Sequence, residues 1–172
     1  MRNSAGAVGL IIFACLLPLG ATYADGSGDP AAVSNKDGAI SIRMGNPTYD
    51  VQSDGMVDWY TYSGFRRYHS ECHVCHGPDG EGSTYAPTLK NSLKTIGYPE
   101  FLSIVATGRQ NVNTAQESVM PAFGENRNVV CYLDDIYVYL RARANEAIGR
   151  GRPAKREDKP EAAAKAEKEC TG

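Results

Sequence analysis

The sequence predicts one small, mostly α-helical domain, and three observations support this prediction. Apolar and aromatic residues recur every three or four positions in segments 57–71 and 128–147, which is the spacing of one helical face. Runs that alternate β-branched with polar residues, as half-buried strands do, are nearly absent beyond the first residues. The 172 residues suffice for one small domain with chain to spare at the ends, and they are too few for a two-domain oxidoreductase.

Charge and hydropathy exclude two broad classes of function. Eighteen Lys and Arg stand against 20 Asp and Glu, a formal net charge of −2, so the chain lacks the basic surface that nucleic acid binding requires. The mean hydropathy of −0.38 excludes a protein with many membrane spans.

The first 24 residues are typical of a signal peptide. Arg2 supplies a short positive region, an apolar run covers residues 5–19, and small residues precede a cleavage point that would leave Asp25 as the first mature residue. The alternative is an uncleaved membrane anchor, but the run is short and Pro18 interrupts it. Export to the periplasm is therefore expected, without membrane insertion of the mature chain. In that oxidising compartment the four mature cysteines are not expected to remain idle thiols.

The mature chain begins with an arm and a helix. Residues 25–56 are rich in Gly, Asp, Ser and Asn, which indicates an extended N-terminal arm outside the core. Segment 57–71 is the first expected helix, and Gly64 lies inside it. Because a glycine within a helix costs about 1 kcal/mol relative to alanine, its presence indicates close packing at that point, although a neutral occurrence is the alternative.

Helical and loop segments alternate in the rest of the chain. Turn residues, apolar spacing and a stop at Gly108 define the shorter segments, and Asn126 or Asn128 can cap the last helix. We expect, in order, a turn-dense loop at 77–98, a short helix at 99–106, a loop at 109–127, a long helix at 128–147, and a charged tail at 150–172 that cannot fold alone.

The end of the first helix carries the motif Cys72-His73-Val74-Cys75-His76. This Cys-x-x-Cys-His spacing is the signal for covalent attachment of c-type haem. Two thiols one helical turn apart can each add to a haem vinyl group, and the adjacent His76 imidazole is then placed to bind the iron. The motif predicts one covalent haem c held by Cys72 and Cys75.

Two other interpretations of the motif stay open from the residues alone. A thioredoxin-like dithiol would need an apolar strand before the motif, whereas the polar segment 66–71 precedes it. A zinc site could recruit His69, His73 or His76, but the remaining cysteines do not form a second pair at zinc-finger spacing. Metal analysis for iron against zinc distinguishes these possibilities.

Beyond the motif, residues 57 to 145 resemble a class I c-type cytochrome. The glycine-rich segment Gly77-Pro78-Asp79-Gly80 and the Pro87-Thr88-Leu89 element are similar to those that follow the haem motif in this family. The resemblance implies an all-α class I cytochrome c fold over residues 57–149, with helices packed around one haem. It also implies that the two long helices cross near Gly64, Phe65 and residues 137–140.

The same resemblance implies the residues around the iron. The Pro87 carbonyl would accept the ring N–H of His76 and so fix the imidazole tautomer and orientation. Candidates for the distal ligand are Met44, Met56 and Met120. Met120 lies in a Met-Pro segment similar to the one that carries the family's ligand, and the alternative is that Met120 only packs near the haem while water binds the iron. With both His76 and Met120 bound, no coordination site is open to a substrate, so an electron-transfer protein rather than an enzyme is expected.

Cys131 and Cys170 are the two mature cysteines outside the motif. In an oxidising compartment the simplest pairing is a disulfide between them, which would tether the charged tail. An intermolecular disulfide or free thiols are the alternatives.

Four mature cysteines, a long arm and a charged tail resemble the methanol-metabolism cytochromes of the cytochrome cL type. That resemblance implies electron transfer from a methanol dehydrogenase that carries pyrroloquinoline quinone (PQQ), lanthanide-dependent enzymes included, to a downstream cytochrome or oxidase. Residues 25–149 carry 10 basic and 15 acidic side chains, and residues 150–172 carry 7 and 5. An acidic body suits steering to a complementary partner, and a generic solvated face is the alternative. The alternative function is a general periplasmic shuttle without a dedicated dehydrogenase.

Overall fold

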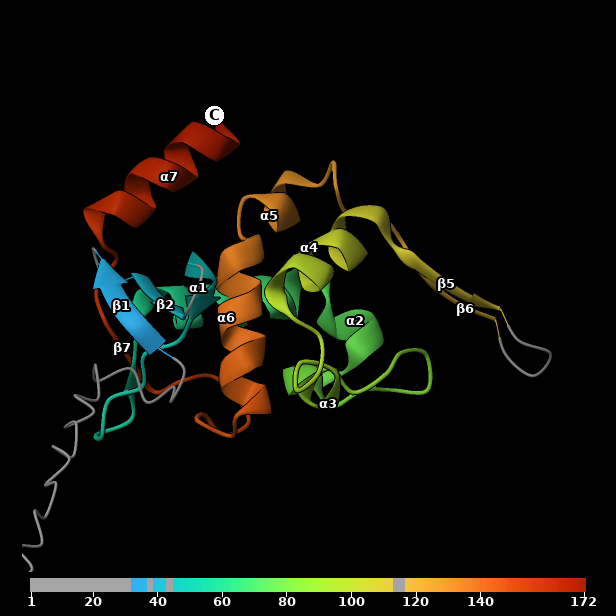
Figure 1. Cartoon of the computed structure of the whole chain (residues 1–172), viewed down its shortest axis with the longest axis horizontal. Helices are drawn as coiled ribbons and strands as arrows, with labels where there is room; N and C mark the ends of the chain where they lie inside the picture. Colours follow the sequence, from blue (N-terminus) through green and yellow to red (C-terminus); the bar gives the residue numbers. More distant parts are fainter. Residues whose placement is uncertain (1–31, 37–38, 43–44, 113–116) are drawn as a thin grey trace, which may run out of the picture.

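The computed structural model describes residues 32–36, 39–42, 45–112 and 117–172 (Figure 1). The predicted signal peptide, residues 1–24, and the candidate ligand Met44 lie outside the described residues.

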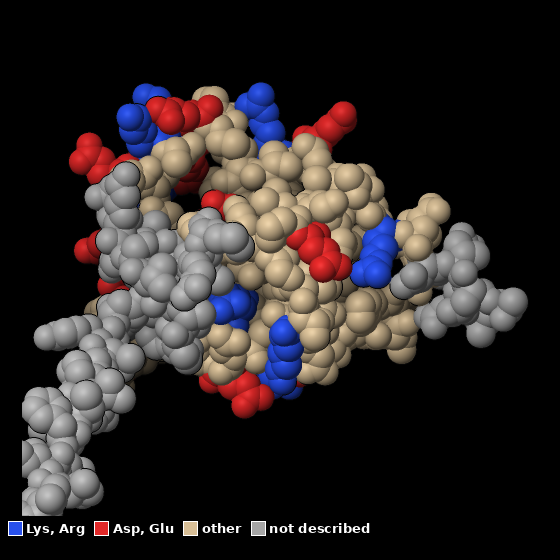
Figure 2. Space-filling model, in the orientation of Figure 1, with Lys and Arg blue, Asp and Glu red and all other residues tan. Residues whose placement is uncertain are grey.

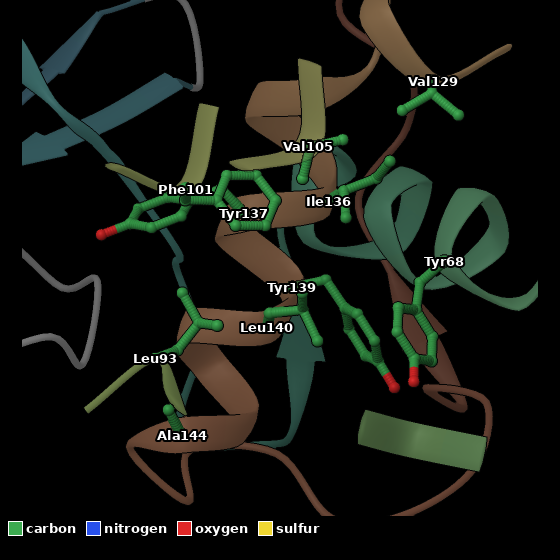
Figure 3. Close-up of a cluster of buried hydrophobic side chains, with 10 residues drawn as sticks. All are labelled: Tyr68, Leu93, Phe101, Val105, Val129, Ile136, Tyr137, Tyr139, Leu140 and Ala144. Carbon is green, nitrogen blue, oxygen red and sulfur yellow. The ribbon is translucent and has the colours of Figure 1, made fainter. Parts of the chain in front are cut away.

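Two helices form the centre of the molecule. Helix α1 spans Trp59–Glu71 and helix α6 spans Leu133–Ala144. Figure 1 shows α6 at the centre of the molecule. Asp58 caps α1, because its side chain accepts a hydrogen bond from the Thr61 backbone N–H at 2.9 Å. The main core cluster draws on both helices and on α4 (Figure 3); its buried members are Tyr68, Leu93, Phe101, Val105, Val129, Ile136, Tyr137, Tyr139, Leu140 and Ala144.

Gly64 is the point of closest approach between α1 and α6. A Cβ atom at this position would lie 1.8 Å from the Asp135 carbonyl oxygen and 2.8 Å from the Tyr139 Cβ. The Phe65 and Tyr139 rings meet edge to face with centroids 5.7 Å apart. The predicted close packing at Gly64 and the predicted crossing of the two helices are confirmed.

Shorter helices surround this pair. The expected helix at 99–106 is confirmed as α4, which ends at Gly108, where φ is +75°. The expected helix at 128–147 is divided in two, because Tyr132 leaves the helical conformation at φ −135° and ψ 20°. The remaining helices in the described residues are α2 (His73–His76), a short 3₁₀ helix (Pro78–Gly80), α3 (Leu89–Ser92), α4 (Tyr98–Thr107), α5 (Arg127–Val130) and α7 (Glu161–Thr171).

The structure contains short strands that the sequence did not predict. The expectation of a loop at 109–127 is wrong for its first part. Residues 109–112 and 117–120 pair as an antiparallel hairpin that extends from the body of the molecule (Figure 1). Strands of two to five residues are too short to show a clear alternation, so the pattern missed them. They are β1 (Ala32–Lys36), β2 (Ala39–Ile42) and β3 (Pro47–Thr48) in one antiparallel sheet, β4 (Met56–Val57) parallel to β7 (Lys155–Arg156), and the hairpin of β5 (Arg109–Val112) and β6 (Glu117–Met120).

The N-terminal arm contributes to the core, which corrects the expectation that it lies outside. Thr48 and Tyr49 are buried. The Arg141 Nε donates to the Thr48 hydroxyl at 3.0 Å, and the Asn145 side-chain amide donates to the Tyr49 hydroxyl at 3.1 Å. Hydroxyl groups let these residues be buried while hydrogen bonded to α6 and the residue after it, a role that a polar composition does not reveal.

The tail returns along the body and ends in a helix held by side chains and a disulfide. Cys131 and Cys170 are joined with an S–S distance of 1.99 Å, and the Tyr132 hydroxyl donates to Glu167 of α7 at 2.6 Å. Charged side chains gather along the edge formed by α7 (Figure 2). The tail is therefore supported by the body, in keeping with its lack of large apolar residues.

Within the residues described, no helix combines the length and the apolar character needed to cross a membrane.

Gly64→Ala tests the helix contact. The added methyl group would overlap the Asp135 backbone, so we expect a loss of about 2 kcal/mol or more in the free energy of unfolding. Gly149→Ala is the matched control, because nothing lies within 4 Å of a Cβ there. Denaturant unfolding of both variants measures the difference, and equal stabilities would contradict the assigned close contact.

Asp135→Asn tests the buried carboxyl beside this contact. Burial raises the pKa of Asp135 to about 7, against a Ser63 hydrogen bond that lowers it. Between the unfolded value of about 3.9 and the folded value, the folded state binds more protons, so the wild type should lose stability relative to the variant as pH rises through this range. Unfolding free energies measured from pH 4 to pH 8 check this, and parallel curves for the two proteins would refute it.

Candidate functional site

An open cavity of about 370 Å³ lies beside the core between α2, α3, α4, β6 and α6. Its lining is mostly apolar, and Figure 3 labels five of the side chains that contribute to it: Leu93, Phe101, Val105, Ile136 and Leu140. A cavity of this size with few polar groups suits a large, flat apolar cofactor.

The Cys-x-x-Cys-His motif forms one wall of this cavity. Cys72, Cys75 and His76 all line it, because Cys72 ends α1 and the following turn continues as α2. The N–H groups of Cys75 and His76 both donate to the Cys72 carbonyl, at 3.3 Å and 3.1 Å. This turn places both thiols and the imidazole on the same side of the backbone.

His76 is oriented from behind by a backbone carbonyl. The imidazole is buried, with 8% of the residue exposed, and its Nδ1 lies 3.1 Å from the Pro87 carbonyl oxygen. A donor at Nδ1 leaves Nε2 as the nitrogen with an available lone pair. Burial lowers the pKa of His76, although the Pro87 hydrogen bond opposes this, so the neutral ring that binds metals is favoured.

The segment between His76 and Pro87 folds tightly against the motif. We call residues 77–82 the ligand loop. The Gly82 N–H donates to the His76 carbonyl at 2.8 Å, and a Cβ on Gly77, which has φ +72°, would lie 2.2 Å from the Gly82 carbonyl oxygen. Only glycine fits at position 77, both for its conformation and for the space available.

Met120 lies on the same cavity as the motif. It ends strand β6, lines the cavity and packs half-buried against the main core cluster. Gly108 allows this approach, because a Cβ there would lie 2.6 Å from the Met120 carbonyl oxygen. Met56, the other described candidate, lies in β4 and is not part of the lining.

The thiols differ in their surroundings. Cys75 is exposed, whereas burial raises the pKa of Cys72 to about 12, with smaller contributions from the nearby Glu71 and Cys75. Burial therefore disfavours the thiolate form of Cys72 relative to the neutral thiol.

These residues fit a c-type haem. Two thiols at attachment spacing, a neutral imidazole fixed through its Nδ1 and a thioether sulfur all line one apolar cavity. The donor set matches the nitrogen and sulfur ligands of this cofactor, and the structure brings together Cys72, Cys75, His76, Pro87 and Met120 along one cavity.

The other two histidines, His69 and His73, form hydrogen bonds with backbone carbonyls and lie outside the cavity lining. His69 Nδ1 bonds the Phe65 carbonyl at 2.8 Å and His73 Nδ1 bonds the His69 carbonyl at 2.9 Å. Neither lines the cavity.

Sequence reasoning missed the polar groups that support the ligand loop. The Tyr68 hydroxyl donates to the Gly77 carbonyl at 2.6 Å, and the Tyr139 hydroxyl donates to the Asp79 carboxylate at 3.3 Å; Figure 3 shows the two hydroxyls pointing the same way. Helical spacing predicted Tyr68 only as part of an apolar face. An aspartate next to Gly80 is the single sequence signal here, since Asp is favoured in tight turns.

No protein-family model matches the chain. Two curated proteins are similar to it. Cytochrome c-553I of Paracoccus denitrificans is 61% identical over 124 residues, which make up 72% of this chain and 55% of that protein, so the chain spans about half the length of this relative. Cytochrome c-555 of Methylococcus capsulatus (strain Bath) is 38% identical over 96 residues, 55% of this chain and 72% of that protein.

A solved structure shows the same fold. The c-type cytochrome XoxG from Methylobacterium extorquens AM1 superposes with a TM-score of 0.76 at 58% sequence identity, and the match covers 81% of this chain and 85% of that chain. The mostly helical class I cytochrome c fold expected from the sequence is confirmed by this match.

Proposed function

Because this chain belongs to the c-type cytochromes, which are electron-transfer proteins rather than enzymes, we propose that it is a periplasmic electron carrier. It accepts single electrons from a PQQ-dependent methanol dehydrogenase, lanthanide-dependent enzymes included, and passes them to a downstream cytochrome or oxidase. The observation that carries the proposal is that Cys72, Cys75, His76 and Met120 line one apolar cavity.

The chain's own residues have distinct roles in holding one haem c. Cys72 and Cys75 would each hold the haem by a thioether bond, in which the sulfur bonds to one carbon of a vinyl group and the thiol proton goes to the other. His76 would supply a ring nitrogen to the iron, and Met120 would supply its thioether sulfur. Bound haem supplies the one-electron change between ferric and ferrous iron.

The surroundings of these residues suit outer-sphere electron transfer. The lining is mostly apolar, and a thioether ligand favours ferrous iron, which raises the reduction potential relative to a nitrogen ligand. With His76 and Met120 both bound to the iron, no coordination position is left for a substrate.

Three large hydrophobic side chains are exposed in the described part of the chain, at Val74, Tyr85 and Val119. Two of them line the cavity and Val74 lies between the motif cysteines, which suits a small, weak redox contact there.

Features outside the haem domain support the methanol dehydrogenase as donor. The expected domain 57–149 makes up 93 of the 172 residues, so the match to XoxG over 81% of the chain includes part of the extensions. The tail is tied to the body by Cys131 and Cys170, which are the cysteines that underlie the resemblance to the cytochrome cL type. The excess of acidic residues in 25–149 suits steering to a basic partner surface.

Met120→Leu tests the distal ligand. Leucine keeps the volume but lacks the sulfur, so we expect loss of the Met-to-iron absorption band and a fall in reduction potential. Met56→Leu is the control and should leave both unchanged, since Met56 is not part of the cavity lining. Absorption spectra and redox titration measure the effect; an unchanged spectrum in Met120→Leu would refute this ligand.

Stopped-flow reduction by purified PQQ methanol dehydrogenase tests the donor. We expect reduction at least tenfold faster than that of an unrelated His/Met cytochrome of similar potential, with a rate that falls as salt rises because charge steers the encounter. A rate equal to that of the unrelated cytochrome would favour the general periplasmic shuttle.

A further inference from the structure

A buried carboxylate in the ligand loop links that loop to the C-terminal tail. Asp79 is 4% exposed and has a left-handed backbone with φ 60° and ψ 19°. This backbone conformation is uncommon for a residue other than glycine, and it is stable only where contacts with the surrounding structure hold the residue in place.

Groups from three other parts of the fold converge on this carboxylate. Oδ1 accepts the Gly151 backbone N–H at 3.0 Å and the Tyr139 hydroxyl at 3.3 Å, and it lies 3.4 Å from His69 Nε2. Oδ2 lies 3.5 Å from Arg150 Nε. The side chain of Asp79 thus joins α1, α6 and the first residues of the tail.

The charge of Asp79 is favoured in this setting. Burial by itself raises the pKa of its carboxyl, but the Gly151 N–H and the nearby cationic groups outweigh burial and lower it overall. The Arg143 Nε also donates to the Asp79 carbonyl at 3.2 Å, and its guanidinium pairs with Glu81 at 2.7 Å. The ligand loop is therefore held by a connected set of charged hydrogen bonds.

The ligand loop in turn contacts the group that orients His76. Thr88 Oγ1 donates to the Glu81 carbonyl at 2.9 Å, and the neighbouring Pro87 carbonyl accepts from His76 Nδ1. The Gly82 N–H bonds the His76 carbonyl directly. A displacement of the loop would therefore move both the backbone of His76 and the carbonyl behind its ring.

We propose that Asp79 is a positioning residue for His76, and that the tail takes part in this role through Arg150 and Gly151. By holding the ligand loop against the tail, Asp79 keeps the Pro87 carbonyl in hydrogen-bonding contact with the imidazole. This inference rests on His76 serving as the proximal haem ligand, as proposed above. A carbonyl that accepts the N–H makes the imidazole a stronger electron donor, which favours ferric iron, so a loosened loop raises the reduction potential.

Two variants of the holoprotein test this role. Asp79→Asn keeps the size and tolerates the left-handed backbone but loses the charge, and Arg150→Gln removes one partner from the tail. We expect both to raise the midpoint potential and to shift the NMR signals of the His76 ring. Asp54→Asn is the matched control, because it removes an exposed ion pair of the same tail, Lys155 to Asp54 at 3.0 Å, far in the chain from the ligand loop.

Arg150→Gln separates positioning from a simple charge effect. Removing a positive charge by itself disfavours ferrous iron and lowers the potential, so a rise in this variant identifies the loop as the cause. The Arg150 side chain is 67% exposed, so this variant is expected to fold even if Asp79→Asn does not. A fall or no change in the potential of Arg150→Gln, or an unchanged potential in a folded Asp79→Asn, overturns the proposal.

The wild-type protein, measured first, separates this proposal from the proposed function. A wild type without covalent haem or without a His/Met spectrum contradicts the proposed function itself. A normal wild-type spectrum with variants that match Asp54→Asn contradicts the positioning role alone.

Discussion

The contact between α1 and α6 at Gly64 is the constraint on which the rest of the structure depends. With no side chain at this position, the backbone of α1 reaches the Asp135 carbonyl of α6, and any Cβ would overlap it. The approach aligns the far end of α1, where Cys72 lies, with Ile136 and Leu140 of α6, which line the cavity. The absence of a side chain at Gly64 therefore helps to set how the Cys-x-x-Cys-His motif faces the apolar wall opposite it.

The cavity joins residues that are far apart in sequence, and backbone carbonyl and N–H groups hold each part by hydrogen bonds. The turn after Cys72 fixes the thiols and the imidazole, and the Pro87 carbonyl fixes the ring. On the other side, Met120 is carried by a hairpin, and the Phe123 N–H just beyond it donates to the Val105 carbonyl of α4 at 3.0 Å. For the single-electron carrier proposed above, such support would limit the rearrangement that accompanies a change of iron charge.

Sequence patterns predicted the features of this structure that depend on residues close together in the chain. Helical spacing predicted the two long helices, and the Cys-x-x-Cys-His motif predicted that its thiols and imidazole lie about one helical turn apart, because each depends on residues within a few positions of one another. The crossing of the helices at Gly64 joins distant residues, and it was implied by the resemblance to class I c-type cytochromes. The hairpin at 109–120 was missed because its strands are short and carry no alternating pattern. The buried roles of Tyr49 and Asp79 were missed because they depend on partners about 60 to 100 residues away, such as Tyr139 and Asn145, and polar composition by itself indicates exposure.

The tail shows how an extension can become part of a small domain. It carries no large apolar residue, so it gains little by burial. Its contacts are polar or covalent instead: Gly151 on the Asp79 carboxylate, the short parallel pairing of β7 with β4, and the Cys170 disulfide at its end. The Gly151 contact lies on the ligand loop, and the disulfide joins Cys170 to Cys131, just before α6. The tail therefore connects the ligand loop to the start of α6. Residues outside the expected domain 57–149 thereby contact the loop that bonds the backbone of His76.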